Sequence, residues 1–179
     1  MIYVFLAEGF EEIEALAPLD LMRRAGLSVT TVGVGGRTVT GAHGITVQAD
    51  IADTEYADAA PEMIFLPGGM PGTLNLAASP VVTDAIRTAT ETGAYLTAIC
   101  AAPSILGDMG LLCGKEATCY PGFEERLVGA TLSEKRVVRD GKIITATGMG
   151  VAVELGLALV ELFRGDQKAK ELRHAVIAD

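Results

Sequence analysis

The sequence predicts an α/β fold in which helices cover both faces of a mainly parallel sheet. Apolar runs of strand length alternate along the chain with longer stretches whose apolar residues recur at helical spacing. Several of the short runs are apolar throughout, which is typical of strands buried on both faces. Half of the 179 residues are hydrophobic. The chain is therefore expected to form one domain, residues 1–179, with a substantial core.

The first strand and the helix after it are predicted over residues 2–7 and 11–25. Gly26 follows this helix, and glycine is the residue that most often ends one. Pro18 lies inside the helical segment. Because proline cannot donate a backbone hydrogen bond, we expect Pro18 to kink the helix or to split it.

The middle of the chain continues the alternation of strands and helices. Residues 28–34 predict a second strand, and two glycines then open a turn toward a weaker alternating segment at 45–48. We assign that weaker segment to a side hairpin. Residues 63–66 are apolar throughout and predict another buried strand. A helix is predicted next, over 80–92, and is closed by Gly93.

The C-terminal part adds a strand that runs directly into a helix, then a hairpin and two further helices. Pro103 falls within the first turn of the first helix, where proline is tolerated. Asp140 and Gly141 separate two β-prone runs and predict the turn of the hairpin. The predicted segments are strands at 95–99, 136–139 and 142–146, and helices at 101–109, 151–163 and 166–177.

Charge and composition exclude several classes of function. The formal net charge is −9, and no cluster of Lys and Arg forms a basic stripe, so binding to nucleic acid through charge is not expected. The N-terminus lacks a positively charged region and turns acidic after seven residues, which argues against a signal peptide or a membrane-spanning helix there. We therefore expect a cytoplasmic protein.

The three cysteines, Cys100, Cys113 and Cys119, lack the spacing of a metal site and are odd in number. Neither a disulfide framework nor a structural zinc site is predicted, which fits a reducing compartment. Cys113 and Cys119 do not lie between a clear strand and a helix, so packing roles are favoured for both. Alternatively, Cys119, in the segment ATCYP, approaches the same pocket as Cys100.

Cys100 lies where a predicted strand meets a predicted helix, the position at which open parallel sheets bind ligands. The small Ala101 and Ala102 permit a sharp turn that would raise the cysteine side chain above the sheet, as in a nucleophile elbow. The N-terminus of the helix is expected to lower the thiol pKa from about 8.5 toward roughly 3.5–7.5. The alternative is a small buried hydrophobic residue, a common fate of free cysteines.

Two other segments are expected beside Cys100 if their strands are neighbours. In AEGFEEIEA, Glu14 stands among apolar residues and is expected to face the sheet, with its pKa raised by burial so that it donates a hydrogen bond to sulfur. Alternatively, this glutamate is one of several helix N-terminal charges in water. In LPGGMPG, the N–H groups near Gly68 and Gly69 suit an oxyanion together with that of Ala101, unless the segment is only a tight turn.

No cofactor site is predicted. The segments GGMPG and TGMG both lack the GxGxxG spacing of a dinucleotide fingerprint. The loop after the first strand is acidic where a phosphate-binding loop would be rich in glycine. The glycines of TGMG are better explained by close packing of a strand on the start of the long helix. Addition of a cysteine thiolate to an aldehyde requires neither a cofactor nor a metal.

Taken together, AEGFEEIEA, LPGGMPG, AICAAPSIL and TATGMGVAVELGLALVELF closely resemble the ThiJ/PfpI superfamily, in particular its branch with the parkinsonism-associated protein deglycase. The resemblance covers nearly the whole chain. It implies a flavodoxin-like three-layer α/β/α sandwich, usually a homodimer. It also implies that Cys100 is the reactive cysteine, Glu14 the protonated glutamate, and Gly69 and Ala101 the backbone donors.

The sequence departs from this family at one position. Many relatives carry a histidine in the segment that corresponds to ATCYPGF, where this chain has Tyr120. His174 is expected to be exposed in the tail helix. His43 lies in a glycine-flanked loop, and we expect it to have no role in the site rather than a supporting one. Without a base beside Cys100, hydrolysis of a peptide bond would lose about 10²–10⁴-fold in rate. A peptidase is accordingly disfavoured.

The resemblance implies a glutathione-independent glyoxalase or deglycase that acts on methylglyoxal, glyoxal or their early adducts. Cys100 would add to the aldehyde and Glu14 would carry a proton. Tyr120 is a candidate contact for the substrate oxygen, and Gly68 and His43 are further candidates. The alternative is a non-catalytic sensor of oxidative stress, or a redox-regulated chaperone, that works through oxidation of Cys100.

Overall fold

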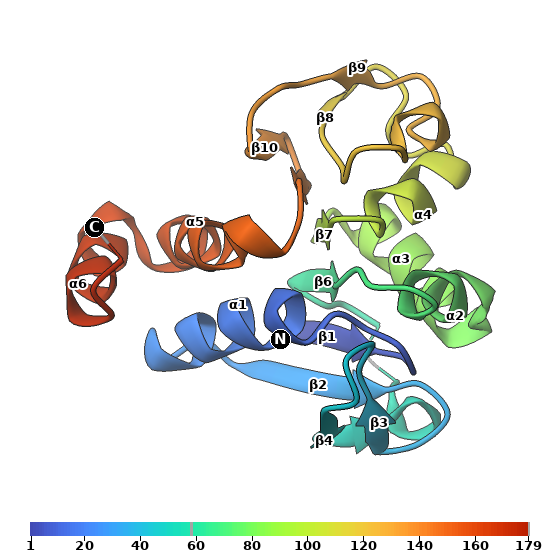
Figure 1. Ribbon diagram of the computed structural model, residues 1–179, viewed down its shortest axis with the longest axis horizontal. Coiled ribbons are helices and arrows are strands. Elements are labelled where there is room, and N and C mark those ends of the chain that lie inside the picture. The colour runs from blue at the N-terminus through green and yellow to red at the C-terminus, as the bar shows by residue number, and fades with distance from the viewer. Residues whose placement is uncertain (58, 179) are drawn as a thin grey trace.

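The structure is a computed structural model that describes residues 1–57 and 59–178. It confirms the predicted α/β fold with a mainly parallel sheet between two layers of helices (Figure 1). The strands of the main sheet are β1 (Ile2–Leu6), β2 (Val29–Gly33), β5 (Ile51–Ala52), β6 (Met63–Leu66), β7 (Tyr95–Ile99), β10 (Val137–Asp140) and β11 (Ile143–Ala146). Their order is β10-β11-β7-β6-β1-β2-β5, and neighbours run parallel except β10 and β11.

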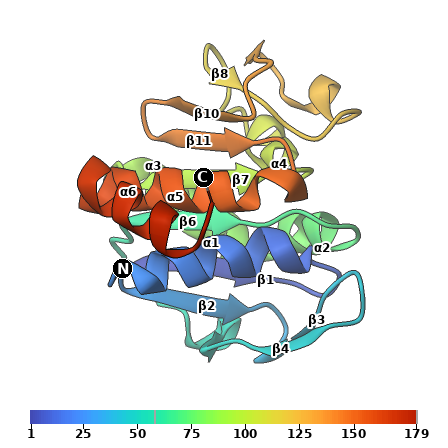
Figure 2. The same ribbon diagram turned by 60° about the vertical axis from the view of Figure 1, so that its left-hand side comes forward.

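Helices cover both faces of the sheet. On one face lie α1 (Glu12–Arg24) and α5 (Ala152–Arg164), with α6 (Asp166–Ala175) packed against them (Figure 2). On the other lie α2 (Gly72–Ala78), α3 (Pro80–Thr92) and α4 (Pro103–Asp108). Each face has its own apolar core, formed by side chains that alternate along the strands. No helix among the described residues is long and apolar enough to cross a membrane.

The strand order brings together the segments that carry the candidate site residues. β1, β6 and β7 are adjacent and parallel, so their carboxyl ends lie side by side at one edge of the sheet. The loop after β1 leads into α1, the loop after β6 is the glycine pair 68–69, and β7 ends directly before Cys100. β11 is parallel to β7 and brings residues 147–149 to the same edge.

Most predicted elements are present, with ends that match or shift by one or two residues. The hairpin around Gly141 and the side hairpin of β3 (Thr38–Thr40) and β4 (Thr46–Gln48) are confirmed. α2, β5 and the short strands β8 (Glu116–Ala117) and β9 (Thr131–Leu132) were not predicted. These elements have two to seven residues, too few to display a helical or alternating pattern.

The expected split of the first helix at Pro18 is wrong, because α1 runs without interruption from Glu12 to Arg24. Its packing against α5 explains why the proline is accommodated. A Cβ atom at Gly156 of α5 would lie 2.9 Å from the Cα of Pro18 and 2.6 Å from the Cδ1 of Leu21. The two helices thus touch at a glycine, and burial at this contact offsets the roughly 3 kcal/mol that an interior proline costs.

We expect Gly156→Ala to lower the free energy of unfolding by about 1–3 kcal/mol, because the added methyl group would push α5 away from the backbone of α1. Helix propensity alone predicts the opposite sign, a gain of about 1 kcal/mol. Urea unfolding followed by circular dichroism measures the difference. Gly150→Ala is the control, since a Cβ there meets nothing within 4 Å. Equal stability of Gly156→Ala and wild type would contradict the close helix contact.

Candidate active site

Cys100 occupies a strained turn between β7 and α4. Its φ angle is 64°, in the left-handed region that a side chain other than glycine rarely adopts. Two backbone hydrogen bonds fix this turn. The Cys100 N–H donates to the carbonyl of Ala146 over 2.9 Å, and the Cys100 carbonyl accepts from the N–H of Tyr120 over 2.8 Å. The turn therefore has the nucleophile-elbow geometry in which a side chain is raised above the end of its strand.

Glu14 approaches the sulfur from the first turn of α1. Its residue is only 1% exposed, and its side chain forms a hydrogen bond with the Cys100 thiol. The N–H groups of Gly68, at 3.0 Å, and of Met149 also donate to its carboxyl group. Burial raises the pKa of Glu14 to about 7, although these hydrogen bonds act to lower it. The carboxyl group therefore holds its proton up to near-neutral pH.

The Cys100 thiol is surrounded by two N–H donors and one acid. The backbone N–H groups of Gly69 and Ala101 bond to the sulfur and act to lower its pKa. Burial and the charge of ionised Glu14 outweigh them and raise the pKa of Cys100 to about 12. The expectation that the helix N-terminus alone would lower this pKa is wrong. α4 has six residues and begins three residues beyond Cys100, so its field does not overcome the burial and the carboxylate.

These two shifts describe a pair that shares one proton around neutral pH. The first proton leaves the pair near the pKa of about 7 at Glu14, and the second is held until about 12 at Cys100. Between these values the pair carries a single negative charge and one proton between oxygen and sulfur. Within this singly charged form the sulfur is a thiolate only when the proton lies on Glu14, which then donates to it; with the proton on Cys100, as the two pKa values place it, the sulfur is a thiol. Nucleophilicity is a property of the pair rather than of the thiol alone.

Glycine at position 68 makes the contact between acid and thiol possible. A Cβ atom there would lie 2.6 Å from both the Cβ of Cys100 and the Oε2 of Glu14. Any side chain at this position would separate the pair. The next residue, Gly69, has a φ angle of 90°, which turns its N–H toward the sulfur at no steric cost. The paired glycines predicted as oxyanion donors are thus bonded to the acid and the thiol.

The other two candidate contacts lie at different distances from the pair. The Tyr120 ring lines the mouth of the site, since a Cβ built on Gly148 would be 3.2 Å from that ring and 3.8 Å from Glu14 Oε1. His43 faces solvent instead, and its Nδ1 lies 3.0 Å from Glu12. Glu12 also accepts the backbone N–H of His43 at 2.8 Å. His43 therefore docks the side hairpin onto α1 and does not pair with Cys100.

The remaining cysteines are separated from Cys100 by their surroundings. All three thiols are free. Cys119 is buried in the apolar core on the α3 face, whereas Cys100 packs against the core on the α1 face. Burial also raises the pKa of Cys119 to about 11. Cys113 is exposed beside Gly129. The structure thus agrees with packing for Cys119 and gives Cys113 no contact with the pair.

One group of described side chains has the spacing of a metal site, namely Glu11, Glu12 and His43, whose ligand atoms lie within 4.8 Å of one another. Hydrogen bonds already account for its geometry. The carboxylate of Glu12 accepts from the backbone N–H groups of His43 and Ile45 and pairs with the His43 ring. Glu11 caps α1 by accepting the Glu14 N–H over 2.7 Å. These contacts connect the side hairpin to α1, so we assign the cluster a structural role.

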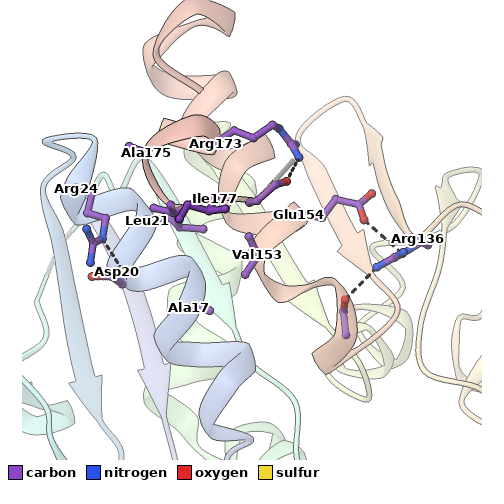
Figure 3. Close-up of a pocket in the computed structure, with 13 residues that line it drawn as sticks. Ala17, Asp20, Leu21, Arg24, Arg136, Val153, Glu154, Arg173, Ala175 and Ile177 are labelled. Atoms are coloured by element: carbon purple, nitrogen blue, oxygen red, sulfur yellow. Dashed lines mark hydrogen bonds and ion pairs between the residues drawn. The ribbon is translucent and has the colours of Figure 1, made fainter. Parts of the chain in front are cut away.

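A groove of about 1000 Å³ lies between α1, α5 and the C-terminal segment (Figure 3). Neither Cys100 nor Glu14 lines it. Its arginines are all engaged, since Arg24 pairs with Asp20, Arg136 pairs with Glu154, and Arg173 donates to a backbone carbonyl. Volume alone would select this groove, but the reactive groups Cys100 and Glu14 lie outside it.

Comparison with known proteins agrees with this fold. Residues 1–162 match the model of the DJ-1/PfpI family. The chain belongs to the DJ-1/PfpI family. The resemblance identified from the sequence is thereby confirmed.

Relatives within the DJ-1/PfpI family match over nearly the entire chain. Protein dj-1beta of Drosophila melanogaster is 34% identical over 97% of this chain and 95% of its own length. The glutathione-independent glyoxalase DJR-1.2 of Caenorhabditis elegans is 31% identical over 92% and 89%. The structure of oxidized DJ-1 from Toxoplasma gondii superposes with a TM-score of 0.94 at 32% identity, covering 98% of this chain and 97% of that one.

Sequence reasoning missed two groups that complete this candidate site. Met149 contributes a backbone N–H to Glu14, and Ala146 contributes the carbonyl that accepts from Cys100. Both contacts use the backbone, so the residue types carry no signal. The only available signal is the TGMG segment, because a glycine before Met149 allows the chain to pass close to Glu14. Interpreting those glycines as a packing feature overlooks this second role.

The raised pKa of Glu14 makes folding depend on pH. The folded protein holds this proton up to a pKa of about 7, against an ordinary value of 4.5. The resulting stability is fully present below pH 4.5 and is lost as the pH rises through 7, a change of up to about 3 kcal/mol. We therefore expect the free energy of unfolding of wild type, relative to Glu14→Gln, to fall by that amount between pH 4.5 and 8.

Chemical denaturation at several pH values measures this difference. Glu91→Gln, at an exposed position of α3, is the matched control and should parallel wild type. A pH-independent difference between wild type and Glu14→Gln would show that the pKa of Glu14 is the same in the folded and unfolded states, and would contradict the raised pKa.

Proposed function

We propose that the chain is a cysteine-dependent, glutathione-independent glyoxalase or deglycase-like enzyme acting on small dicarbonyls, such as methylglyoxal and glyoxal, or on their early adducts. The observation that carries this proposal is the hydrogen-bonded pair of Cys100 and Glu14 with one proton between them. A family relative from Caenorhabditis elegans named as a glutathione-independent glyoxalase supports it.

In the first proposed step the sulfur of Cys100 adds to the aldehyde carbon. The pair enters the step as thiolate and neutral carboxylic acid. The new C–S bond uses the thiolate electron pair, the C=O π pair moves to oxygen, and this oxygen takes the proton of Glu14. The product is a hemithioacetal, and Glu14 is left as a carboxylate. The N–H groups of Gly69 and Ala101, which bond the sulfur, are close enough to stabilise the developing oxyanion.

In the second step the carboxylate of Glu14 acts as a base. It removes the hydrogen from the former aldehyde carbon as a proton to give an enediolate, and then returns this proton to the neighbouring carbon, while the hydroxyl proton of the first carbon passes to the oxygen of the second. The first carbon is oxidised to a thioester and the second is reduced to an alcohol, so no external oxidant is needed. Water then hydrolyses the thioester to a 2-hydroxy acid and restores the thiol. One proton carrier thus serves both steps.

The residues around the pair receive supporting roles in this proposal. We assign Tyr120, whose ring lies beside Gly148, the donation of its phenolic proton to the ketone oxygen. Gly68 holds the acid through its N–H, so we assign it a positioning role. His43, paired with Glu12, keeps the side hairpin against α1. We further propose a cytoplasmic homodimer, because the family resemblance implies the dimer and three free cysteines suit a reducing compartment.

Turnover of methylglyoxal to lactate is expected for wild type and is measured by loss of the dicarbonyl and enzymatic detection of lactate. Cys100→Ser should abolish turnover, since a serine hydroxyl does not lose its proton to the carboxylate of Glu14. Glu14→Gln should lower kcat by about 10²–10⁴-fold, because the amide donates a hydrogen bond but cannot carry the proton. Cys113→Ser, at an exposed position, should retain full activity. Equal rates in all four proteins would end the proposal.

A second candidate function is sensing of oxidants, and the donors around the sulfur favour it. Oxidation by two equivalents of peroxide, each reduced to water, converts the thiolate first to sulfenate and then to sulfinate. The sulfinate oxygens would accept from Gly69, Ala101 and protonated Glu14, the groups that now bond the sulfur. The similarity of the chain to the oxidized DJ-1 of Toxoplasma gondii supports this second candidate function.

Mild peroxide treatment is expected to add two oxygen atoms at Cys100 and to leave Cys113 and Cys119 largely unchanged, as measured by mass spectrometry of peptides. Glu14→Gln should slow this oxidation. Selective oxidation without any turnover of methylglyoxal would favour the sensor over the enzyme. Oxidation that correlates with exposure, with Cys113 modified first, would remove the sensor hypothesis.

A further inference from the structure

Glu11 is joined to the acid of the Cys100–Glu14 pair by hydrogen bonds that form a closed ring of three residues. The N–H of Glu11 donates to the carbonyl of Gly68 over 2.9 Å. The N–H of Gly68 donates to Glu14 Oε2 over 3.0 Å, and the N–H of Glu14 donates back to Glu11 Oε2 over 2.7 Å. A movement of Glu14 relative to Gly68 therefore strains at least one bond to Glu11.

The backbone of Glu11 also lies directly against the glycine loop after β6. A Cβ atom at Gly69 would be 2.3 Å from the nitrogen of Glu11, so a side chain does not fit between them. The N–H of Gly69 bonds to the sulfur of Cys100. The backbone of Glu11 thus supports the residue that donates to the thiol as well as the residue that donates to the acid.

Helix capping alone does not explain a glutamate at position 11. The residue is the N-cap of α1, a position at which Ser, Thr, Asp and Asn are preferred. A neutral cap would satisfy the N–H of Glu14 without placing a negative charge beside a buried acid. Burial is the main cause of the raised pKa of Glu14, and the charge of Glu11 raises this pKa further. The charge at position 11 therefore has a consequence for the site that a helix cap does not require.

The other titratable groups around Glu11 are arranged in a separate pair. Glu12 and His43 have side-chain atoms within 4.8 Å of its carboxylate, and these two groups pair with each other over 3.0 Å. The elements packed against Glu14 contribute the Cys100 thiol and uncharged backbone N–H groups. Glu11 is half-buried, so water and salt screen its charge less than that of an exposed residue. Its carboxylate thus supplies a negative charge directly beside the acid.

We propose that Glu11 is a positioning residue of this site: its hydrogen bonds hold Glu14 against Gly68, and its negative charge shifts the shared proton from Cys100 toward Glu14. This inference rests on the proposed function and concerns the regulation of the same site. The proton moves between the two groups without an external donor or acceptor, so the pair still carries one charge in total. As the proton moves to the carboxyl group, the negative charge moves to the sulfur. The thiolate form that begins the first step is then more populated.

The pH dependence of Cys100 alkylation by iodoacetamide tests this role, because alkylation requires the thiolate and no dicarbonyl. Mass spectrometry of the Cys100 peptide measures the rate. In wild type the rate should rise near pH 7, as the pair loses its first proton, and then level off. In Glu11→Asn the rise should occur at lower pH, because Glu14 ionises more readily. The level rate should be about threefold lower, the effect of one unit charge a few ångströms away in a largely aqueous dielectric.

Glu11→Asp is the matched variant, since aspartate and asparagine cap a helix about equally well and differ in charge. It should keep the wild-type midpoint and level rate. Glu8→Gln removes a charge from the same loop, where the carboxylate accepts the N–H of Thr40, and should also match wild type. A wild-type profile in Glu11→Asn, or an equal change in Glu11→Asn and Glu11→Asp, would overturn the inference.

Turnover of methylglyoxal by the same proteins separates this inference from the proposed function. An alkylation profile that shifts in Glu11→Asn, without turnover in any of the proteins, would overturn the proposed function and support the role of Glu11. Turnover by wild type, together with an unshifted profile in Glu11→Asn, would overturn the role of Glu11 and support the function.

Discussion

The hydrogen bond between the Cys100 thiol and the Glu14 carboxyl group is the interaction on which the site depends. It requires a carboxyl group without water and a thiol on a strained turn, and both are costly in isolation. Their proximity lowers this cost, because the buried acid and the partly buried thiol carry only one charge between them. Three elements meet to make the contact: α1 carries the acid, β7 ends at the thiol, and the loop after β6 passes between them only because Gly68 has no side chain.

The acidic segment at the start of α1 connects this pair to the surrounding loops. Each glutamate there has a different partner. Glu11 donates its N–H to the Gly68 carbonyl and caps the helix, Glu12 holds the side hairpin through His43, and Glu14 reaches the thiol. The sequence suggests a single group of negative charges at the helix N-terminus, but each of the three glutamates makes a separate contact. A change at Glu11 or Glu14, which both contact Gly68, would be felt at Gly68 and so at Cys100.

The sequence predicted best where apolar pattern and end signals agree. α3 matches its predicted range because Ser79 caps it, Pro80 opens it and Gly93 closes it in the left-handed conformation. The continuous α1 could not be predicted, since its tolerance of Pro18 comes from a glycine contact with a helix more than a hundred residues away. The candidate residues were named from motifs, but the pKa of Cys100 was not, because it depends on burial and on the charge of Glu14. Backbone donors such as Met149 leave no trace in residue type.

The shared proton also explains why one site suits both addition to aldehydes and oxidation by peroxide. Each reaction begins with attack by the thiolate, and that form exists while Glu14 keeps the proton. The two reactions diverge after this first attack. Addition to an aldehyde uses the proton at once and then needs the carboxylate as a base, whereas a sulfinate needs the acid to remain protonated as a donor. The preference between them is therefore set by how readily Glu14 releases its proton after the first bond forms. A residue with a pKa of about 7 can do both at neutral pH, and an acid shifted much further in either direction would support only one.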